Sequence, residues 1–350
     1  MSEIGKYIYG IINSNNALHL FTPKDSYKRE RVYTIPYQGV SAVVSDSEII
    51  DYTHERKDTL ARLLVWHQKV IEKVMSLKHT IIPVRLGSFA MDEAGVGDIL
   101  SKGHSLIRDI MGNISDKIET DIVATWSDFN SVLKEVGEEK EIKGLKEKIL
   151  VNPKGITMDD QMKMGVMVKK TLDEKREKYA LQIQTYLRDC FNSLKIHELM
   201  DDKMVINAAF LINKHEQKDF DKKVEELNTK FAEKLDFRCV GPLPPYSFYT
   251  LEIKKMKFEE IDWARNKLEI LDDFVTKNEV KKAYKKLAFS FHPDRNPNTP
   301  GTEKEFGEIT KACGILYEYC EACKQAGKGD SLYFDEEEFK KNIILVKVKE

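Results

Sequence analysis

The sequence is short of cysteine, of long apolar runs and of excess charge of either sign. Its 350 residues include five unevenly spaced cysteines, too few for a disulfide framework, so we expect a cytoplasmic protein. No apolar run approaches the roughly 18 residues that span a bilayer, and the first five residues lack the regions of a secretory signal, so we expect no lipid-membrane partner. Lys and Arg total 56 against 58 Asp and Glu, a net charge of −2, without the basic excess of a general nucleic-acid binder.

Motifs for catalysis and for cofactors are also missing. There is no Gly-x-x-x-x-Gly-Lys loop and no dinucleotide fingerprint, so we expect no nucleotide cofactor. Cys320 and Cys323 have the spacing of metal ligands, but no second Cys-x-x-Cys pair and no nearby histidine accompany them, so we expect no metal. No acid, base and nucleophile can be assembled into one constellation, and we predict that the protein is not an enzyme.

Apolar periodicity predicts an α+β fold in four parts. Residues 1–137 form the first α+β domain, with strands expected at 6–12, 32–35, 39–45, 80–85 and 118–126 and helices at 53–78 and 92–111. Residues 138–257 form the second, with helices expected at 159–200 and 216–234 and strands at 203–213, 237–240 and 248–253. Residues 258–325 are expected to be helical only. Residues 326–350 form an acidic tail and a terminal strand, 343–348, expected to pair with a sheet of an earlier domain.

The sharpest local motif is Phe291-His292-Pro293-Asp294. Upstream, Thr276 and Glu279 have the spacing of a capping box that begins a helix. Pro293 ends that helix and moves the preceding residue out of the α region, so the motif is expected at a bend. The helix carries a cationic outer surface, formed by Lys281, Lys282, Lys285 and Lys286. Apolar spacing downstream, from Phe306 to Leu316, predicts a second helix packed antiparallel on the first.

This helical hairpin, residues 260–323, resembles a J-domain, the module by which Hsp40 co-chaperones engage Hsp70 (DnaK). The resemblance implies an Hsp70-binding surface made of Lys281, Lys282, Lys285, Lys286, His292, Pro293 and Asp294. Two stretches depart from the family pattern: Leu271-Asp272-Asp273 replaces the usual Leu-Gly turn, and 312–316 lacks the usual basic-aromatic pattern. A J-like hairpin that serves only as a docking wedge is the alternative.

Segments of the first 257 residues resemble the gas vesicle protein F/L (GvpF/GvpL) family. The resemblance rests on residues 7–11, 61–87, 207–211 and the Gly241-Pro242-Leu243-Pro244-Pro245-Tyr246 element, where Leu243 replaces a tryptophan. The residues that carry the family pattern in a structural role are His67, Pro83, Arg85, Gly87, Gly241, Pro242, Pro244, Pro245 and Tyr246. The resemblance implies two ferredoxin-like α+β domains before the all-α J-domain hairpin.

His67, Arg85 and the Pro244-Pro245-Tyr246 element can also be interpreted from the residues around them. His67 falls within an apolar helical stripe, so we favour a core histidine with satisfied hydrogen bonds over a catalytic one. Arg85 is expected to anchor the turn at Gly87. The Pro244-Pro245-Tyr246 element has no nucleophile and base beside it in the sequence, so we interpret it as a rigid entry to a strand.

The two resemblances together imply an accessory protein of gas vesicle assembly. Its expected partners are the small gas vesicle shell protein, other gas vesicle accessory proteins and Hsp70, and its expected location is the cytoplasm, at the gas vesicle. Such a shell subunit has large apolar faces that aggregate unless they are covered. The alternative function is a minor structural component of the gas vesicle shell with a J-like docking module.

Overall fold

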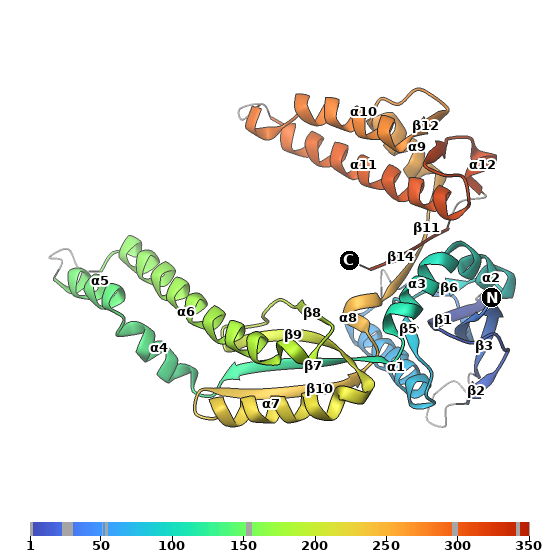
Figure 1. The fold of residues 1–350 in the computed structure, drawn as a ribbon. Helices are drawn as coiled ribbons and strands as arrows, with labels where there is room; N and C mark the ends of the chain where they lie inside the picture. Colours follow the sequence, from blue (N-terminus) through green and yellow to red (C-terminus); the bar gives the residue numbers. More distant parts are fainter. Residues whose placement is uncertain are drawn as a thin grey trace. The chain divides into compact units, whose positions relative to one another are not determined.

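The computed structural model describes residues 3–22, 31–50, 52, 55–151, 156–295, 300–340 and 344–349. The chain divides into two compact units, one formed by Met1–Asn113 with Tyr249–Glu350 and the other by Ile114–Phe248 (Figure 1). The Asn152-Pro153-Lys154-Gly155 stretch, whose composition indicates a turn, lies outside the described residues. Among the described residues, no helix is long and apolar enough to cross a bilayer.

The first unit is built on an antiparallel sheet around β1 (Ile4–Ile12), which is apolar on both faces and therefore takes a central place. The sheet order is β2 (His19–Phe21), β3 (Val32–Tyr37), β4 (Val40–Glu48), β1 and β5 (Ile81–Pro83), with β6 (Phe89–Ala90) also paired to β1. Helix α1 (Lys57–Ser76) buries the middle of its predicted apolar stripe, including His67 and Val74, whereas Leu77 at the end of that stripe is exposed. The helix expected at 92–111 is two helices, α2 (Glu93–Lys102) and α3 (His104–Ile114), separated at Gly103.

The second unit is an antiparallel sheet in the order β10 (Leu235–Leu243), β7 (Lys117–Trp126), β9 (Met204–Asn213) and β8 (Ser193–Ile196). One face packs on a core that includes Ile122, Ile183, Phe210 and Phe220. The helices of this unit are α4 (Phe129–Gly137), α5 (Lys140–Leu150), α6 (Met158–Leu187), α7 (Gln217–Phe231) and the short α8 (Tyr246–Tyr249).

Three expectations for the middle of the chain differ from the structure. The first domain was expected to end at 137, but the units divide after Asn113 because β7 pairs with β9 and β10. The helix expected to reach residue 200 ends at Leu187, and the chain then forms β8. The strand expected at 248–253 is the end of α8 followed by β11 (Leu251–Lys255).

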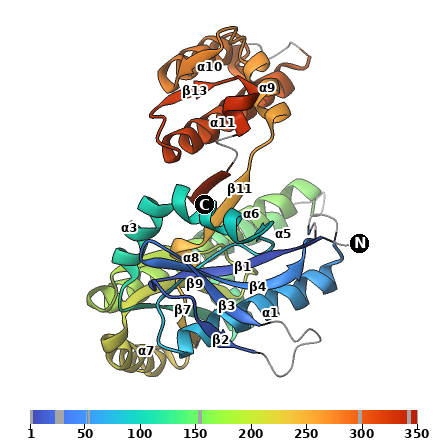
Figure 2. The same ribbon diagram turned by 90° about the vertical axis from the view of Figure 1, so that its right-hand side faces the viewer.

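The C-terminal region contains the predicted helical hairpin, formed by α10 (Lys277–Ser290) and α11 (Thr302–Gln325), which lie side by side (Figure 2). Helix α9 (Phe258–Lys267) completes the expected helices. The tail is not separate from them: β13 (Ser331–Tyr333) pairs with β12 (Phe274–Thr276), and α12 (Glu336–Lys340) places Phe339 in the same core. The terminal strand β14 (Ile344–Val348) joins neither large sheet and pairs with β11 in a two-stranded ribbon.

The mixed α/β architecture followed by a helical hairpin is therefore as predicted, although a small strand pair accompanies the helices.

Candidate functional site

The basic helix α10 begins at the predicted capping box. The backbone N–H of Thr276 donates to the Glu279 carboxylate at 2.7 Å, and the N–H of Glu279 donates to the Thr276 hydroxyl at 3.4 Å. The hydrogen bonds from Thr276 lower the pKa of Glu279. With its start fixed, the helix buries Val280 and Leu287 against the rest of the C-terminal core.

The opposite side of α10 carries the four predicted lysines, Lys281, Lys282, Lys285 and Lys286, and the side chains of all four are exposed. Lys286 lies 3.4 Å from the carboxylate of Glu269, a pair exposed on both sides and therefore weak. The helix thus presents a cationic surface that an acidic partner can approach.

The His-Pro-Asp loop follows directly. Helix α10 ends at Ser290, and Pro293–Arg295 form a single 3-10 turn. The His292 ring packs edge-on against Phe306 of α11, with ring centroids 5.3 Å apart, and its Nδ1 accepts the backbone N–H of Asp294 at 3.2 Å. The Asp294 side chain is 88% exposed. The imidazole therefore holds the loop in shape, while the carboxylate faces solvent beside the lysine helix.

His67 lies in the core of the first unit. Its Nε2 donates to the carbonyl of Val84 at 2.9 Å, which leaves Nδ1 to accept the hydroxyl proton of Tyr7 at 2.7 Å. Burial lowers the pKa of His67 to about 4. The imidazole is therefore neutral at physiological pH, and both its nitrogens have partners, which agrees with the core interpretation.

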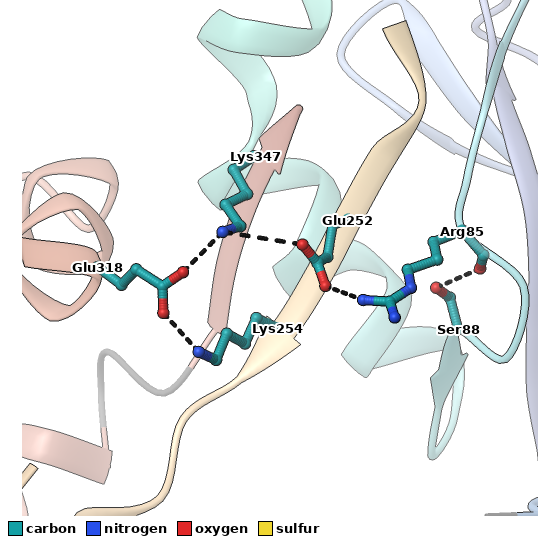
Figure 3. A network of polar contacts seen from close by, with 6 residues as sticks. All are labelled: Arg85, Ser88, Glu252, Lys254, Glu318 and Lys347. Atoms are coloured by element: carbon teal, nitrogen blue, oxygen red, sulfur yellow. Dashed lines mark hydrogen bonds and ion pairs between the residues drawn. The ribbon is translucent and has the colours of Figure 1, made fainter. Parts of the chain in front are cut away.

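Pro83 and Arg85 flank the end of β5. Pro83 pairs with Gly10 of β1. The guanidinium of Arg85 forms an ion pair with Glu252 of β11 (Figure 3). We had expected Arg85 to anchor the turn at Gly87, and its guanidinium does not do so. That turn is closed by the hydroxyl of Ser88, which donates to the carbonyl of Arg85 at 2.7 Å.

Gly87 itself has φ +83°, and a Cβ there would lie 2.8 Å from the Tyr52 ring. The turn therefore requires glycine on both counts.

The 241–246 element lies at the end of β10. Gly241 and Pro242 are joined by a cis peptide bond. A Cβ on Gly241 would come within 2.8 Å of the Thr120 hydroxyl, so only glycine permits this approach to β7. Pro244 and Pro245 then lead into α8, which begins at Tyr246. The element enters a short helix, whereas a strand was expected.

The structure adds a buried polar cluster that the sequence did not reveal. The carboxylate of Glu119, on β7, accepts the backbone N–H of Ser247 at 2.8 Å and its hydroxyl at 2.7 Å. Nε2 of His197 lies 3.1 Å from the same hydroxyl. Burial raises the pKa of Glu119 to about 7 and also raises that of its neighbour Asp121.

Ser247 therefore lies near a histidine, His197, although the sequence showed no nucleophile and base beside the Pro244-Pro245-Tyr246 element. Its hydroxyl proton is donated to a carboxylate, however, and the arrangement fixes α8 to the sheet. The available signal was the pair Glu119 and Asp121, two carboxyl groups at alternate positions of one strand.

The three C-terminal cysteines, Cys313, Cys320 and Cys323, are buried in the core of the helical region. Burial raises the pKa of Cys323 to about 11, which makes the thiol unreactive. Among the described residues, no group of three or more His, Cys, Asp and Glu side chains could hold a metal ion.

Two family models match the chain. The one described as gas vesicle synthesis protein GvpL/GvpF matches residues 5–250, and the DnaJ domain matches residues 266–320. Gas vesicle protein F of Nostoc sp. is 23% identical over 225 residues, which cover 61% of this chain and 91% of that protein. DnaJ homolog subfamily C member 5 of Xenopus laevis is 48% identical over 46 residues, 13% of this chain and 23% of that protein.

The fold is also similar to a solved structure. The crystal structure of GvpF from Anabaena sp. PCC7120 superimposes with a TM-score of 0.59 at 23% identity and covers 71% of this chain and 98% of that one.

Proposed function

The chain belongs to the gas vesicle synthesis protein GvpL/GvpF family and carries a DnaJ domain, and from this premise we propose that it binds the gas vesicle shell protein during assembly and recruits Hsp70. The first 250 residues would supply contacts to the shell protein and to other gas vesicle accessory proteins. The J-domain would bring Hsp70 to the same place, in the cytoplasm at the growing gas vesicle.

The observation that carries the Hsp70 part of the proposal is the geometry of the His-Pro-Asp loop. Asp294 is exposed at the end of a helix whose outer side carries four exposed lysines. His292 packs on Phe306 and accepts the N–H of Asp294, so the loop shape does not depend on a partner. A preformed loop binds without paying the entropy of ordering it. We assign the Hsp70 contact to Lys281, Lys282, Lys285, Lys286, His292, Pro293 and Asp294.

An exposed apolar stripe on α6 supports a contact with the shell protein. One side of this helix packs on the core of the second unit through residues such as Met164 and Val168. Met158, Met162 and Val166, spaced four residues apart, are exposed by 65–78%. A helix that is apolar on two sides needs a partner for the second side, and a subunit with apolar faces fits it.

The Hsp70 part is tested by the ATPase rate of Hsp70 with the full chain added. Asp294→Asn removes the charge with little change in shape, and His292→Gln removes the ring that holds the loop; both should abolish the stimulation. Asp262→Asn, on exposed α9, is the matched control and should stimulate like the unchanged chain. Equal stimulation by all four proteins would refute the assignment and leave the docking-wedge alternative.

The shell part is tested by light scattering from the shell protein as it aggregates. The chain should suppress the scattering, and Met162→Glu with Val166→Glu should weaken the suppression, because charges are then placed on the apolar stripe. No suppression and no captured complex would refute the proposal. Copies that stay on washed vesicles in fixed proportion to the shell protein would instead favour the minor structural component.

A further inference from the structure

The two matched regions leave two pieces of the chain unassigned, residues 251–265 between them and 321–350 after them. These pieces meet in the fold. Strand β11 comes from the first and β14 from the second, and they pair antiparallel over their full length, from Leu251 opposite Val348 to Lys255 opposite Ile344. An isolated two-stranded ribbon is marginally stable in water, so its neighbours must hold it.

The J-domain holds one side of the ribbon. The side-chain amide of Gln325, the last residue of α11, pairs with the backbone of Val346 like an added strand: its Nε2 donates to the carbonyl at 2.6 Å and its Oε1 accepts the N–H at 3.0 Å. Glu318 accepts hydrogen bonds from Lys254 of β11 at 2.5 Å and from Lys347 of β14 at 2.6 Å (Figure 3).

Glu318 and Gln325 are seven residues apart, close to two helical turns, so both lie on the side of α11 that faces the ribbon.

The electrostatics agree with a tight contact. Burial alone would raise the pKa of Glu318, but the hydrogen bonds from Lys254 and Lys347 outweigh it and hold the pKa below its usual value. Leu345, opposite Lys254 in the ribbon, is buried in the core of the J-domain region.

The N-terminal part of the same unit, Met1–Asn113, holds the other side of the ribbon. The backbone N–H of Arg85 donates to the carbonyl of Leu251 at 2.8 Å, and its guanidinium pairs with Glu252. Val346 is fully buried, and its side chain lies 2.9 Å from where a Cβ on Gly103 would be. Gly103 thus leaves room for Val346 at the end of α2.

We infer that the β11–β14 ribbon docks the J-domain in one orientation on the N-terminal part of the same compact unit, Met1–Asn113. A flexible tether would be a polar segment without regular pairing, whereas here each strand residue from 251 to 255 is paired. The functional consequence rests on the proposed function: Hsp70 would be activated at one fixed position on the N-terminal sheet of the first unit, independent of linker length.

The test is the distribution of distances between two spin labels, measured by pulsed electron resonance on the full chain. The labels are attached at Glu72→Cys and Lys304→Cys, two exposed positions on α1 and α11, after Cys190→Ser and Cys239→Ser remove the accessible thiols. Neither Hsp70 nor shell protein is present. The test therefore stays separate from the proposed function: a narrow distribution without ATPase stimulation would keep the coupling and refute the function.

The ribbon variants are Glu318→Gln with Gln325→Ala, and the control is Glu321→Gln, which changes a partly exposed glutamate one turn away on the same helix. We expect one narrow peak for the unchanged chain and for the control, and loss of that peak in the double variant. A broad distribution in the unchanged chain, or an equally narrow one in the double variant, would overturn the inference. If the double variant loses helical circular dichroism, Glu318→Gln alone is measured and judged in the same way.

Discussion

Glu119→Gln should remove most of the pH dependence of stability in the second unit. Glu119 is 1% exposed and holds α8 by accepting two hydrogen bonds from Ser247. The amide of a glutamine can keep both contacts, with its oxygen accepting the Ser247 N–H and its NH2 group donating to the Ser247 hydroxyl, and it never becomes charged. The substitution therefore separates the cost of the buried charge from the value of the hydrogen bonds.

The magnitude follows from the pKa of this carboxyl group. Burial raises it from an ordinary value of 4.5 to about 7 in the folded protein. The folded state then binds the proton more tightly than the unfolded state, so the stabilisation is complete below pH 4.5 and is lost as the pH rises to 7. The difference, 7 − 4.5, at about 1.36 kcal/mol for each pH unit, amounts to about 3 kcal/mol.

The groups that face Glu119 are Asp121 and His197. Asp121, whose pKa is also raised by burial, changes stability in the same direction. Both groups remain in the variant, so a comparison with the unchanged chain reports on Glu119 together with its interaction with Asp121.

The assay is urea unfolding at steps between pH 4 and pH 8. With Trp66→Phe and Trp263→Phe, the fluorescence reports on the buried Trp126 of the second unit alone. The unchanged chain should lose about 3 kcal/mol more than Glu119→Gln over this range. Parallel curves for the two proteins would refute a buried, partly protonated Glu119.

Two further predictions concern packing in the first unit. His67→Phe should destabilise the unit by about 2–4 kcal/mol, because the Tyr7 hydroxyl and the Val84 carbonyl lose their buried partner. The measurement is urea unfolding followed by the fluorescence of Trp66. A loss of stability below about 0.5 kcal/mol would contradict the hydrogen-bond assignment. Gly103→Ala should lower the melting temperature, because the added methyl group would lie 2.9 Å from the Val346 side chain. Gly112→Ala is the control: its methyl group would have no atom within 4 Å, so the higher helix propensity of alanine should raise the melting temperature. Equal shifts in the two variants would contradict the contact.

The helical hairpin could be predicted from the sequence because its determinants are local. Thr276 and Glu279 begin α10, Pro293 prevents its continuation, and the apolar spacing after Phe306 fixes the face of α11. Membership in the GvpL/GvpF family and the presence of a DnaJ domain were predicted for a similar reason, since each resemblance rests on short contiguous segments. The ferredoxin-like topology and the assignment of the Hsp70 contact residues stay predictions.

The parts that could not be predicted depend on pairing between distant segments. The alternation in 117–126 indicates a strand but does not say which sheet it joins, and its partner β9 is about 90 residues away. Ser247 lies 128 residues from Glu119, so neither residue indicates the other. Arg85 was likewise expected to anchor the adjacent turn at Gly87, but its ionic partner, Glu252, is 167 residues away.

The central claim is that one chain links the gas vesicle shell protein to Hsp70. Its most direct test is the recovery of non-aggregated shell protein with Hsp70, ATP and the full chain together, compared with the same mixture containing Asp294→Asn. We predict that the unchanged chain, Hsp70 and ATP together recover more shell protein than the sum of the separate components, and that Asp294→Asn reduces recovery to that sum. Equal recovery with the unchanged chain and with Asp294→Asn would contradict the account.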